Sequence, residues 1–330
     1  MTRNRANDNQ MQLQKTDRRQ WVWTDLQTKR GNQVIETVNA LNDYWPLTLR
    51  QIYYRLVAAG HIKNTVSSYN GLSQLIKFMR LADWLPWQVL EDRGRRVSNK
   101  RGWGDHTEFM EQEVDNFLEG YGRCYVQDQE RYVELWCEKD ALSQVFEKVA
   151  WPYCIRAVTC RGYQSITFLD SFRRRAQAAQ EKGQMPVILY FGDLDPSGMQ
   201  MFEATKQTLE DEMSLWRVEY HRVALNPDQV KTFDLPVDPQ AIKLTDKRYK
   251  NFVERFGLVA VELDALHPKT LQEMAVEAIK SQFDMDLFWE QQEVERVERQ
   301  RLAGIKEKIV AELKIMTSHK GQMEGGANER

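Results

Sequence analysis

The sequence predicts an α/β protein with two modules, a basic helical one followed by a larger one built on a parallel β-sheet. The sheet is indicated by apolar runs that alternate with amphipathic segments beyond residue 120. One run, 187–191, is apolar throughout and lies between Pro186 and Gly192, which is typical of a strand buried on both faces of such a sheet. The two modules also differ in charge: residues 1–101 contain 17 lysines and arginines against 8 acidic residues, whereas residues 102–330 contain 29 against 40.

The first module has the outline of a winged helix. Residues 1–17 are polar and are expected to be disordered. Helices are expected over residues 20–44 with an interruption near Gly31, over residues 49–59 between the N-cap Thr48 and Gly60, and over residues 69–81. A basic segment over residues 91–103 is typical of a turn or β-wing, and helix, turn, helix and wing together suggest a DNA-binding module. Nucleic acid is therefore the first candidate partner, although a solvated basic face without a ligand explains the charge equally well.

The second module is expected to alternate strands with helices. Strands are predicted over residues 132–137, 153–158, 187–191, 217–225 and 259–263, and helices over residues 105–119, 141–149, 164–180, 197–213, 247–256, 271–282 and 286–314. A hinge is expected at residues 120–122 and a loose end at residues 317–330. We therefore expect four parts: a disordered tail (1–17), a winged-helix DNA-binding domain (18–120), a sheet domain (121–283), and a charged C-terminal helix with its tail (284–330).

Composition argues against membrane and secreted proteins. No apolar run reaches the roughly eighteen residues that a membrane span needs, and residues 1–15 lack the apolar segment of a signal peptide. We therefore expect a cytoplasmic protein. The four cysteines, Cys124, Cys137, Cys154 and Cys160, have the spacing of neither a zinc ribbon nor a zinc finger. They are expected to be reduced thiols buried in strands.

Carboxylates follow three of the predicted strands. The pairs are Glu138 with Asp140, Asp193 with Asp195, and Glu262 with Asp264. Ligands bind at the carboxyl edge of an open parallel sheet, and if the strands are neighbours, so many like charges need a cation to remain ionised together. Oxygen ligands without His or Cys favour Mg²⁺, with Mn²⁺ as the alternative, and two such ions would stabilise both oxygens in a phosphodiester displacement.

A simpler interpretation exists for the second pair. Asp195 precedes Pro196, which suits the first position of a helix, and an amphipathic segment follows. On this interpretation, Asp195 caps a helix and the Asp-x-Asp sequence has no chemical role. The other acidic pairs are what favour a site.

The basic module contains a candidate nucleophile. A tyrosine hydroxyl has a reference pKa of about 10 and needs a neighbouring cation or base to attack at neutral pH. Arg50 lies four residues before Tyr54 on the predicted helix, so the guanidinium and the phenol share a face. Arg50 could favour the phenolate or hold a phosphate. Alternatively, Tyr53 and Tyr54 are aromatic residues that only pack.

Four segments resemble one family in its own order. The stretch 47–56, Leu-Thr-Leu-Arg-Gln-Ile-Tyr-Tyr-Arg-Leu, resembles the tyrosine motif of the topoisomerase VI A subunit and its meiotic double-strand-break relatives. The stretches 135–142, Leu-Trp-Cys-Glu-Lys-Asp-Ala-Leu, and 191–198, Phe-Gly-Asp-Leu-Asp-Pro-Ser-Gly, are similar to that family's Toprim motifs. The stretch 261–266, Val-Glu-Leu-Asp-Ala-Leu, is similar to a further family segment. The resemblance covers roughly residues 45–280 and implies a winged-helix domain followed by a Toprim domain with a Rossmann-like parallel sheet.

The resemblance also implies a type IIB DNA transesterase. It implies that Tyr54 attacks double-stranded DNA and forms a 5′-phosphotyrosyl bond, assisted by Arg50. It implies that Glu138, Asp193 and Asp195 hold Mg²⁺. It further implies a homodimer in which the tyrosine of one subunit works with the metals of its partner.

This sequence departs from the family in one respect. Type IIB topoisomerases couple strand passage to a separate ATPase B subunit, and this chain has neither a P-loop nor a recognisable ATPase segment. Its length resembles that of the compact stand-alone "mini-A" homologues of mobile genetic elements. Cleavage and rejoining are therefore expected here, while ATP-driven strand passage depends on a partner or is missing.

We expect the basic residues of the first module to contact the DNA backbone, namely Arg55, Lys77, Arg80, Arg93, Arg95, Arg96, Lys100 and Arg101. Two other functions stay open. A Toprim-type hydrolytic nuclease would use water as the nucleophile, and Tyr54 would only pack. A non-catalytic dimer would bridge DNA duplexes, with the acidic edge as a structural metal site. The sequence assigns no role to Glu262 or Asp264.

Overall fold

The computed structural model describes residues 23–90, 102–160, 162, 164–237 and 249–324, with side chains up to residue 312. The chain divides into two compact units. Unit 1 comprises Met1–Arg95 and Glu130–Gln282, and unit 2 comprises Arg96–Gln129 and Phe283–Arg330. Each unit is described by itself; the domain boundaries predicted at residues 17, 120 and 283 stay predictions.

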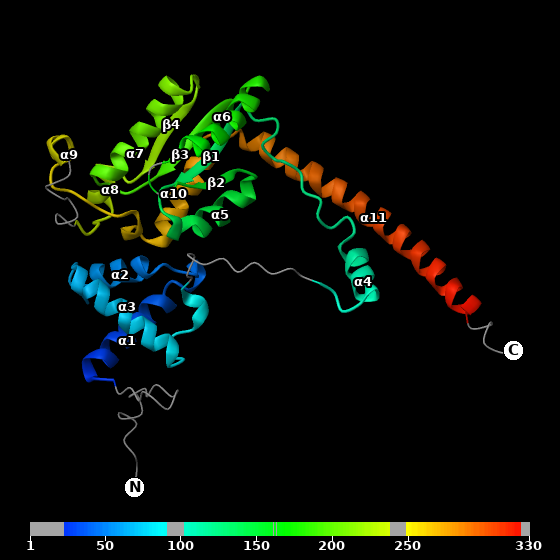
Figure 1. The fold of residues 1–330 in the computed structure, drawn as a ribbon, viewed down its shortest axis with the longest axis horizontal. Coiled ribbons are helices and arrows are strands. Elements are labelled where there is room, and N and C mark those ends of the chain that lie inside the picture. The colour runs from blue at the N-terminus through cyan, green and yellow to red at the C-terminus, as the bar shows by residue number, and fades with distance from the viewer. Residues whose placement is uncertain (1–22, 91–101, 161, 163, 238–248, 325–330) are drawn as a thin grey trace, which may run out of the picture. The chain divides into compact units, whose positions relative to one another are not determined.

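A parallel four-stranded sheet forms the centre of unit 1 (Figure 1). Its strands are β1 (Arg131–Cys137), β2 (Arg156–Thr159), β3 (Met185–Phe191) and β4 (Glu219–Ala224), in the order β2-β1-β3-β4. The last residues of β1 and β3, Cys137 and Phe191, are paired, so these two strands end together. The predicted α/β class is thereby confirmed, and β3 is the buried central strand that its apolar sequence predicts.

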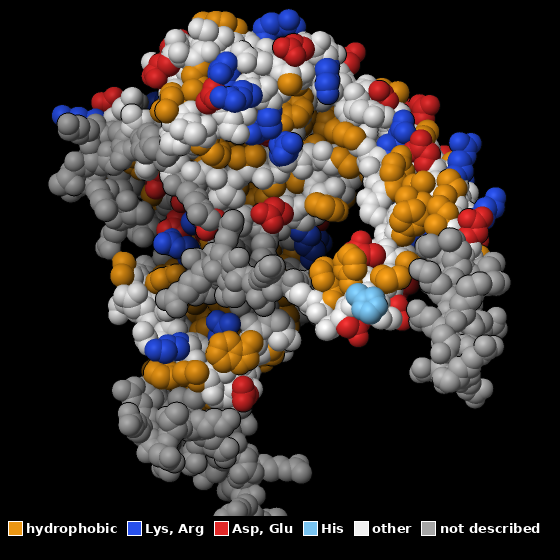
Figure 2. Space-filling view, turned by 45° about the vertical axis from the view of Figure 1, so that its right-hand side comes forward, with side chains coloured by type: hydrophobic (Ala, Val, Ile, Leu, Met, Phe, Trp, Pro, Cys, Tyr) orange, Lys and Arg blue, Asp and Glu red, His pale blue; other side chains and the backbone are white. Residues whose placement is uncertain are grey.

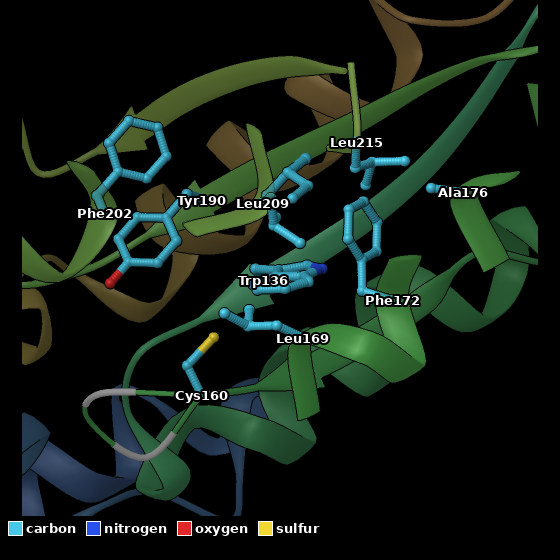
Figure 3. Close-up of a cluster of buried hydrophobic side chains, with 10 residues drawn as sticks. Trp136, Cys160, Leu169, Phe172, Ala176, Tyr190, Phe202, Leu209 and Leu215 are labelled. Carbon is cyan, nitrogen blue, oxygen red and sulfur yellow. The ribbon is translucent and has the colours of Figure 1, made fainter. Parts of the chain in front are cut away.

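Helices cover both faces of this sheet. They include α5 (Ser143–Ala150), α6 (Ile166–Glu181), α7 (Pro196–Gln207) and α10 (Pro268–Lys280). Side chains alternate along each strand, so Trp136 and Tyr190 face the apolar sides of α6 and α7 (Figure 3). Phe191 points to the opposite face, where its ring lies 4.8 Å from that of Phe146 on α5. Because both faces are buried, the carboxyl edge is where functional groups of the sheet can reach solvent.

The described N-terminal residues of unit 1, 23–90, include the α-helices α1 (Asp25–Asn39), α2 (Leu49–Ala58) and α3 (Val66–Leu81). Thr48 caps α2 as predicted, with Gln51 completing a capping box. The interruption expected near Gly31 is wrong, because α1 continues through it. A Cβ at this glycine would lie 2.1 Å from the ring of Trp84, so glycine permits close packing and does not break the helix. Most of the predicted wing, residues 91–101, lies outside the described residues.

Two predicted strands differ in the structure. The predicted strand 259–263 is wrong: Val261 forms a single antiparallel bridge with Leu194, and a 3₁₀ turn, Leu263–Ala265, follows at once. The segment therefore crosses the carboxyl end of β3 and does not extend the sheet. The strand predicted from residue 153 begins later, because a 3₁₀ turn, Trp151–Tyr153, precedes β2.

The remaining helices of unit 1 include one, α8 (Pro227–Thr232), that was not predicted. Helix α7 ends in a π-helical turn, Thr208–Glu212; α8 follows β4, and α9 (Tyr249–Phe256) precedes the crossing segment. None of the four cysteines forms a disulfide; Cys137 lies in a strand, Cys160 is buried just after β2, and Cys124 and Cys154 are exposed. The expectation that the thiols are buried in strands is therefore wrong for Cys124 and Cys154, and for Cys160 it holds for burial but not for the strand.

Unit 2 contains the helices α4 (His106–Asn116) and α11 (Met285–Glu324). Helix α11 continues through residues 317–324, where a loose end was expected. Arg123 joins the two parts of the unit: its backbone N–H donates to Glu295 at 2.9 Å and its guanidinium pairs with Glu298 at 3.1 Å. Apolar side chains are exposed on this unit (Figure 2), among them Phe109, Met110, Trp289 and Ile305. Within the part of the chain that the structure describes, no helix combines the length and the apolar character that crossing a bilayer requires.

Candidate functional site

Glu138 meets the loop after β3 because β1 and β3 end together. Its backbone N–H donates to the Phe191 carbonyl at 2.9 Å, which makes it the first residue beyond the paired strands. Its Oε2 accepts the backbone N–H of Asp193 at 3.1 Å. Gly192 must be a glycine in this loop, since a Cβ there would lie 2.6 Å from the same Oε2. Two of the predicted acidic pairs therefore converge.

Asp195 caps α7 as the sequence predicts. Its Oδ1 accepts the backbone N–H of Gly198 at 2.6 Å, and Pro196 is the first helical residue. Gly198 lies so close to the loop that a Cβ would approach the Asp193 carbonyl oxygen to 2.4 Å. The N-terminus of α7 is thus packed directly against the loop, and capping fixes the Asp195 carboxylate there.

Arg222 on β4 binds the backbone of this loop. This role of Arg222 was not predicted from the sequence. Its guanidinium donates to the carbonyl oxygens of Asp193 at 2.6 Å, Gly192 at 3.2 Å and Gly198 at 3.3 Å. Its guanidinium carbon also lies 5.5 Å from the centre of the Tyr190 ring. The only clue in the sequence is an arginine inside a short strand next to the acidic edge. Arg222 fixes the backbone of the loop and leaves the carboxylates on it available.

The electrostatics of this edge favour a bound cation. Burial, together with the nearby charges of Asp193 and Asp195, raises the pKa of Glu138 to about 7. Burial also raises the pKa of Asp195, and Asp193 adds to the effect. Both shifts disfavour the ionised carboxylates, so a positive charge placed among them would be stabilising.

Lys139 supplies a cation on the other side of Asp193. Its Nζ is paired with Asp264, lies 3.1 Å from Oε2 of Glu262, and lies 3.7 Å from Oδ1 of Asp193. Burial alone would lower the pKa of Lys139, but the carboxylates of Asp264 and Asp193 outweigh it and raise that pKa, so the ammonium stays charged. Sequence analysis missed this residue, although it directly follows Glu138. The third acidic pair, Glu262 and Asp264, is therefore neutralised in part by the chain itself.

The segment 262–265 joins the acidic edge to α2. Asp264 is fully buried, and its Oδ1 accepts the hydroxyl proton of Thr48, the N-cap of α2, at 2.9 Å. The guanidinium of Arg55 donates to the Ala265 carbonyl. On the other side, the backbone N–H of Leu263 donates to Oδ1 of Asp193 at 2.7 Å. Helix α2 is therefore docked, within unit 1, on the same segment that contacts Asp193.

Tyr53 and Tyr54 differ in their surroundings. The Tyr53 hydroxyl lies 3.0 Å from Oδ1 of Asn64 and 3.1 Å from the Thr65 carbonyl oxygen, so its proton has two acceptors within reach. Among the described residues, the Tyr54 hydroxyl has no hydrogen-bond partner; Tyr54 is 6% exposed and lines a pocket of about 190 Å³ together with Arg50. Burial raises the pKa of Tyr54 and Arg50 opposes the shift. The neighbouring cation thus acts in the direction that the predicted role of Arg50 requires.

Glu138, Asp193 and Asp195 fit a divalent cation in their chemistry. All three offer carboxylate oxygens, which suit Mg²⁺ or Mn²⁺. Burial raises the pKa of Glu138, and the charges of Asp193 and Asp195 raise it further. Among the residues that the structure describes, no three His, Cys, Asp or Glu side chains form a ready group of metal ligands. The donor types are therefore suitable, while the coordination group is not preassembled.

Three of the residues expected to bind DNA lie in the described part of the chain. Lys77 is exposed on α3. Arg80 lies over the Trp87 ring, at 4.5 Å from its centre, and donates to the Trp87 carbonyl at 3.2 Å. Arg55 is turned toward Ala265. Their DNA contacts stay a prediction, and the other five residues, Arg93, Arg95, Arg96, Lys100 and Arg101, lie outside the described residues.

Comparison with known proteins adds no family assignment. No protein-family model matches the chain, and no curated protein matches it.

Proposed function

We propose that the chain is a topoisomerase VI A-like DNA transesterase that cleaves and rejoins double-stranded DNA. The convergence of Glu138 with the loop of Asp193 and Asp195, in a chain that also places Tyr54 and Arg50 in one pocket, is the observation that carries the proposal. Acids from separate strands are needed for a metal centre, and a phenol next to an arginine is needed for attack on a phosphate. Helices α1–α3 would belong to a winged-helix domain whose wing lies in residues 91–103.

In the proposed reaction, the Tyr54 oxygen forms a bond to the scissile phosphorus and the 3′ oxygen of the neighbouring nucleotide leaves. The phenol gives up its proton, the leaving oxygen gains one, and the DNA 5′ end remains linked to the protein. Attack by the 3′ hydroxyl on the phosphotyrosyl bond reverses the step and rejoins the strand. Arg50 would hold the phosphate through charge-assisted hydrogen bonds.

Glu138, Asp193 and Asp195 would hold Mg²⁺, which would stabilise negative charge on the reacting phosphate and its leaving oxygen. Two copies of the chain would act on the two DNA strands, each tyrosine working with the acids of the partner subunit. Strand passage driven by ATP would need a separate ATPase subunit.

Trapping of the covalent intermediate tests this proposal. Purified protein is incubated with Mg²⁺ and supercoiled plasmid, denatured with detergent, and analysed for protein on the 5′ ends. Wild type and Tyr53→Phe should give adducts and Tyr54→Phe should not, because only the phenol of residue 54 is proposed to attack. Adducts that survive Tyr54→Phe would refute the assignment.

A hydrolytic nuclease is the second candidate, and the burial of Tyr54 favours it. A phenol with a raised pKa is a weaker nucleophile at neutral pH than its phenolate, so water could attack in its place. This function predicts cut DNA with free ends that is unaffected by Tyr54→Phe and abolished by Asp193→Ala. The same gel that detects adducts distinguishes the two.

A further inference from the structure

Arg50 is already bound to an anion of its own chain. Its Nη1 pairs with Oε1 of Glu262, and the pair forms part of the pocket that Tyr54 lines. The guanidinium carbon lies 5.6 Å from the centre of the Tyr69 ring, which forms another side of the pocket. The cation that would receive a phosphate beside Tyr54 is therefore occupied by a carboxylate.

Carboxylate and phosphate oxygens compete for the same donors. A guanidinium binds either anion through charge-assisted N–H···O bonds with similar geometry. The two anions carry like charge, so a DNA phosphate cannot bind tightly next to Arg50 while Glu262 keeps its place on the same nitrogen. Each anion therefore weakens the binding of the other, and release of Glu262 favours binding of the phosphate.

Glu262 keeps a positively charged partner when it releases Arg50. Its second oxygen, Oε2, lies 3.1 Å from Nζ of Lys139, and that contact does not involve Arg50. The side chains of Arg50 and Glu262 are 40% and 28% exposed. Ion pairs with this much solvent contribute little to stability, so the exchange has a small cost.

The docking of α2 does not depend on this pair. Thr48 holds Asp264, and Arg55 holds the Ala265 carbonyl, through contacts that do not use Arg50. Release of Arg50 therefore requires a rotation of one side chain and no movement of the helix.

We propose that Glu262 is an internal competitor for the phosphate site at Arg50, and that a DNA phosphodiester displaces it when the strand reaches Tyr54. This inference rests on the proposed function for the role of Arg50 and adds a role for Glu262. The displaced carboxylate stays with Lys139, and the site opens only to a ligand whose charge can replace it. Glu262 thereby limits the occupancy of the pocket by free anions and by DNA that is not correctly seated.

A double-mutant cycle on DNA binding tests the inference. The variants are Glu262→Gln, Arg50→Gln and the double substitution, each checked by thermal unfolding. Binding of a fluorescein-labelled DNA duplex is measured by anisotropy in EDTA, so that neither metal nor cleavage contributes, at about 0.15 M salt, where charges beyond roughly 8 Å are screened. Glu273→Gln is the matched control, since Glu273 is exposed on α10 and pairs only with Lys269 among the described residues.

Glu262→Gln should bind DNA about two- to five-fold more tightly than wild type, which corresponds to the energy of a partly exposed ion pair. Glu273→Gln should give a smaller gain. When Arg50 is already replaced by glutamine, Glu262→Gln should increase DNA affinity by no more than Glu273→Gln does. The inference is overturned if Glu262→Gln gains no more than Glu273→Gln, or if its gain persists without Arg50.

The outcomes separate this inference from the proposed function. If the double-mutant cycle shows no coupling between Glu262 and Arg50 but adducts still form on Tyr54, the role of Glu262 is overturned and the proposed transesterase function stands. A cycle effect without adducts supports the phosphate exchange and contradicts the transesterase. Failure of the wild type and every variant to bind the duplex overturns both.

Discussion

Asp264→Asn should destabilise unit 1, because it removes the carboxylate charge that pairs with Lys139 and so joins Lys139 to the segment 262–265, on which α2 is docked. The amide oxygen of asparagine can still accept the Thr48 hydroxyl proton, so the 2.9 Å bond at Oδ1 is retained. The contact between Lys139 and Oδ2 is lost, and an amide NH₂ then faces a buried ammonium. Nζ of Lys139 keeps Glu262 at 3.1 Å and Asp193 at 3.7 Å.

The expected loss is about 2–3 kcal/mol of unfolding free energy. A hydrogen bond to a charged group contributes roughly 1.5–3 kcal/mol, and a wholly uncompensated buried charge costs about 3–5 kcal/mol. The upper range does not apply, since two carboxylates still neutralise Lys139. Denaturant unfolding followed by tryptophan fluorescence measures the change, with Glu273→Gln as the control that removes an exposed carboxylate. A loss below about 0.5 kcal/mol, the usual size for a surface change, would refute the argument that Asp264 carries this link.

Two further predictions concern packing and pH. Gly31→Ala should lower the unfolding free energy by about 1–3 kcal/mol, because its Cβ would meet the Trp84 ring. Gly71→Ala on α3 is the control: its Cβ would meet no atom within 4 Å, so the unfolding free energy should stay unchanged or rise by up to about 1 kcal/mol. Denaturant unfolding curves of the two variants give the comparison. The pKa of Glu138 is raised from 4.5 to about 7, so folding favours the protonated carboxyl group. In the metal-free protein, this contribution to the unfolding free energy is fully present below pH 4.5 and is lost as pH rises through 7. Mg²⁺ competes with that proton, so the increase in melting temperature on adding Mg²⁺ should be larger above pH 7 than below it, and an equal increase on both sides would contradict a metal at Glu138.

The parallel sheet could be predicted from sequence because its central strand is marked locally. Five apolar residues between Pro186 and Gly192 have no polar face, and only burial on both sides of a sheet suits such a run. The cap at Asp195 and the capping box at Thr48 are likewise local, since each involves contacts within three residues. Residue patterns that act over one helical turn were therefore interpreted correctly.

The misinterpreted elements depend on contacts between distant parts of the chain. Gly31 has the composition of a helix breaker, but its role is set by Trp84, which approaches from beyond α3. Residues 259–263 have a strand composition, yet Val261 pairs only with Leu194, because the segment crosses the sheet edge. The same limit explains why Lys139 and Arg222 were missed: their partners come from other strands and loops, and no spacing in the sequence marks them.

Asp193 lies between two groups of charged residues, one around Lys139 and one formed by Glu138 and Asp195. On one side, Lys139 neutralises Asp264 and Glu262 in part and lies 3.7 Å from Asp193, so the chain supplies a cation there. On the other side lie Glu138 and Asp195, whose pKa values are raised by burial and, to a smaller extent, by the neighbouring carboxylates. A divalent cation therefore gains more on the side of Glu138 and Asp195, since it would be repelled by Lys139 on the other. This asymmetry supports Glu138, Asp193 and Asp195 as the proposed metal ligands, and it leaves Glu262 and Asp264 to hold Arg50 and Thr48 of the tyrosine-bearing helix.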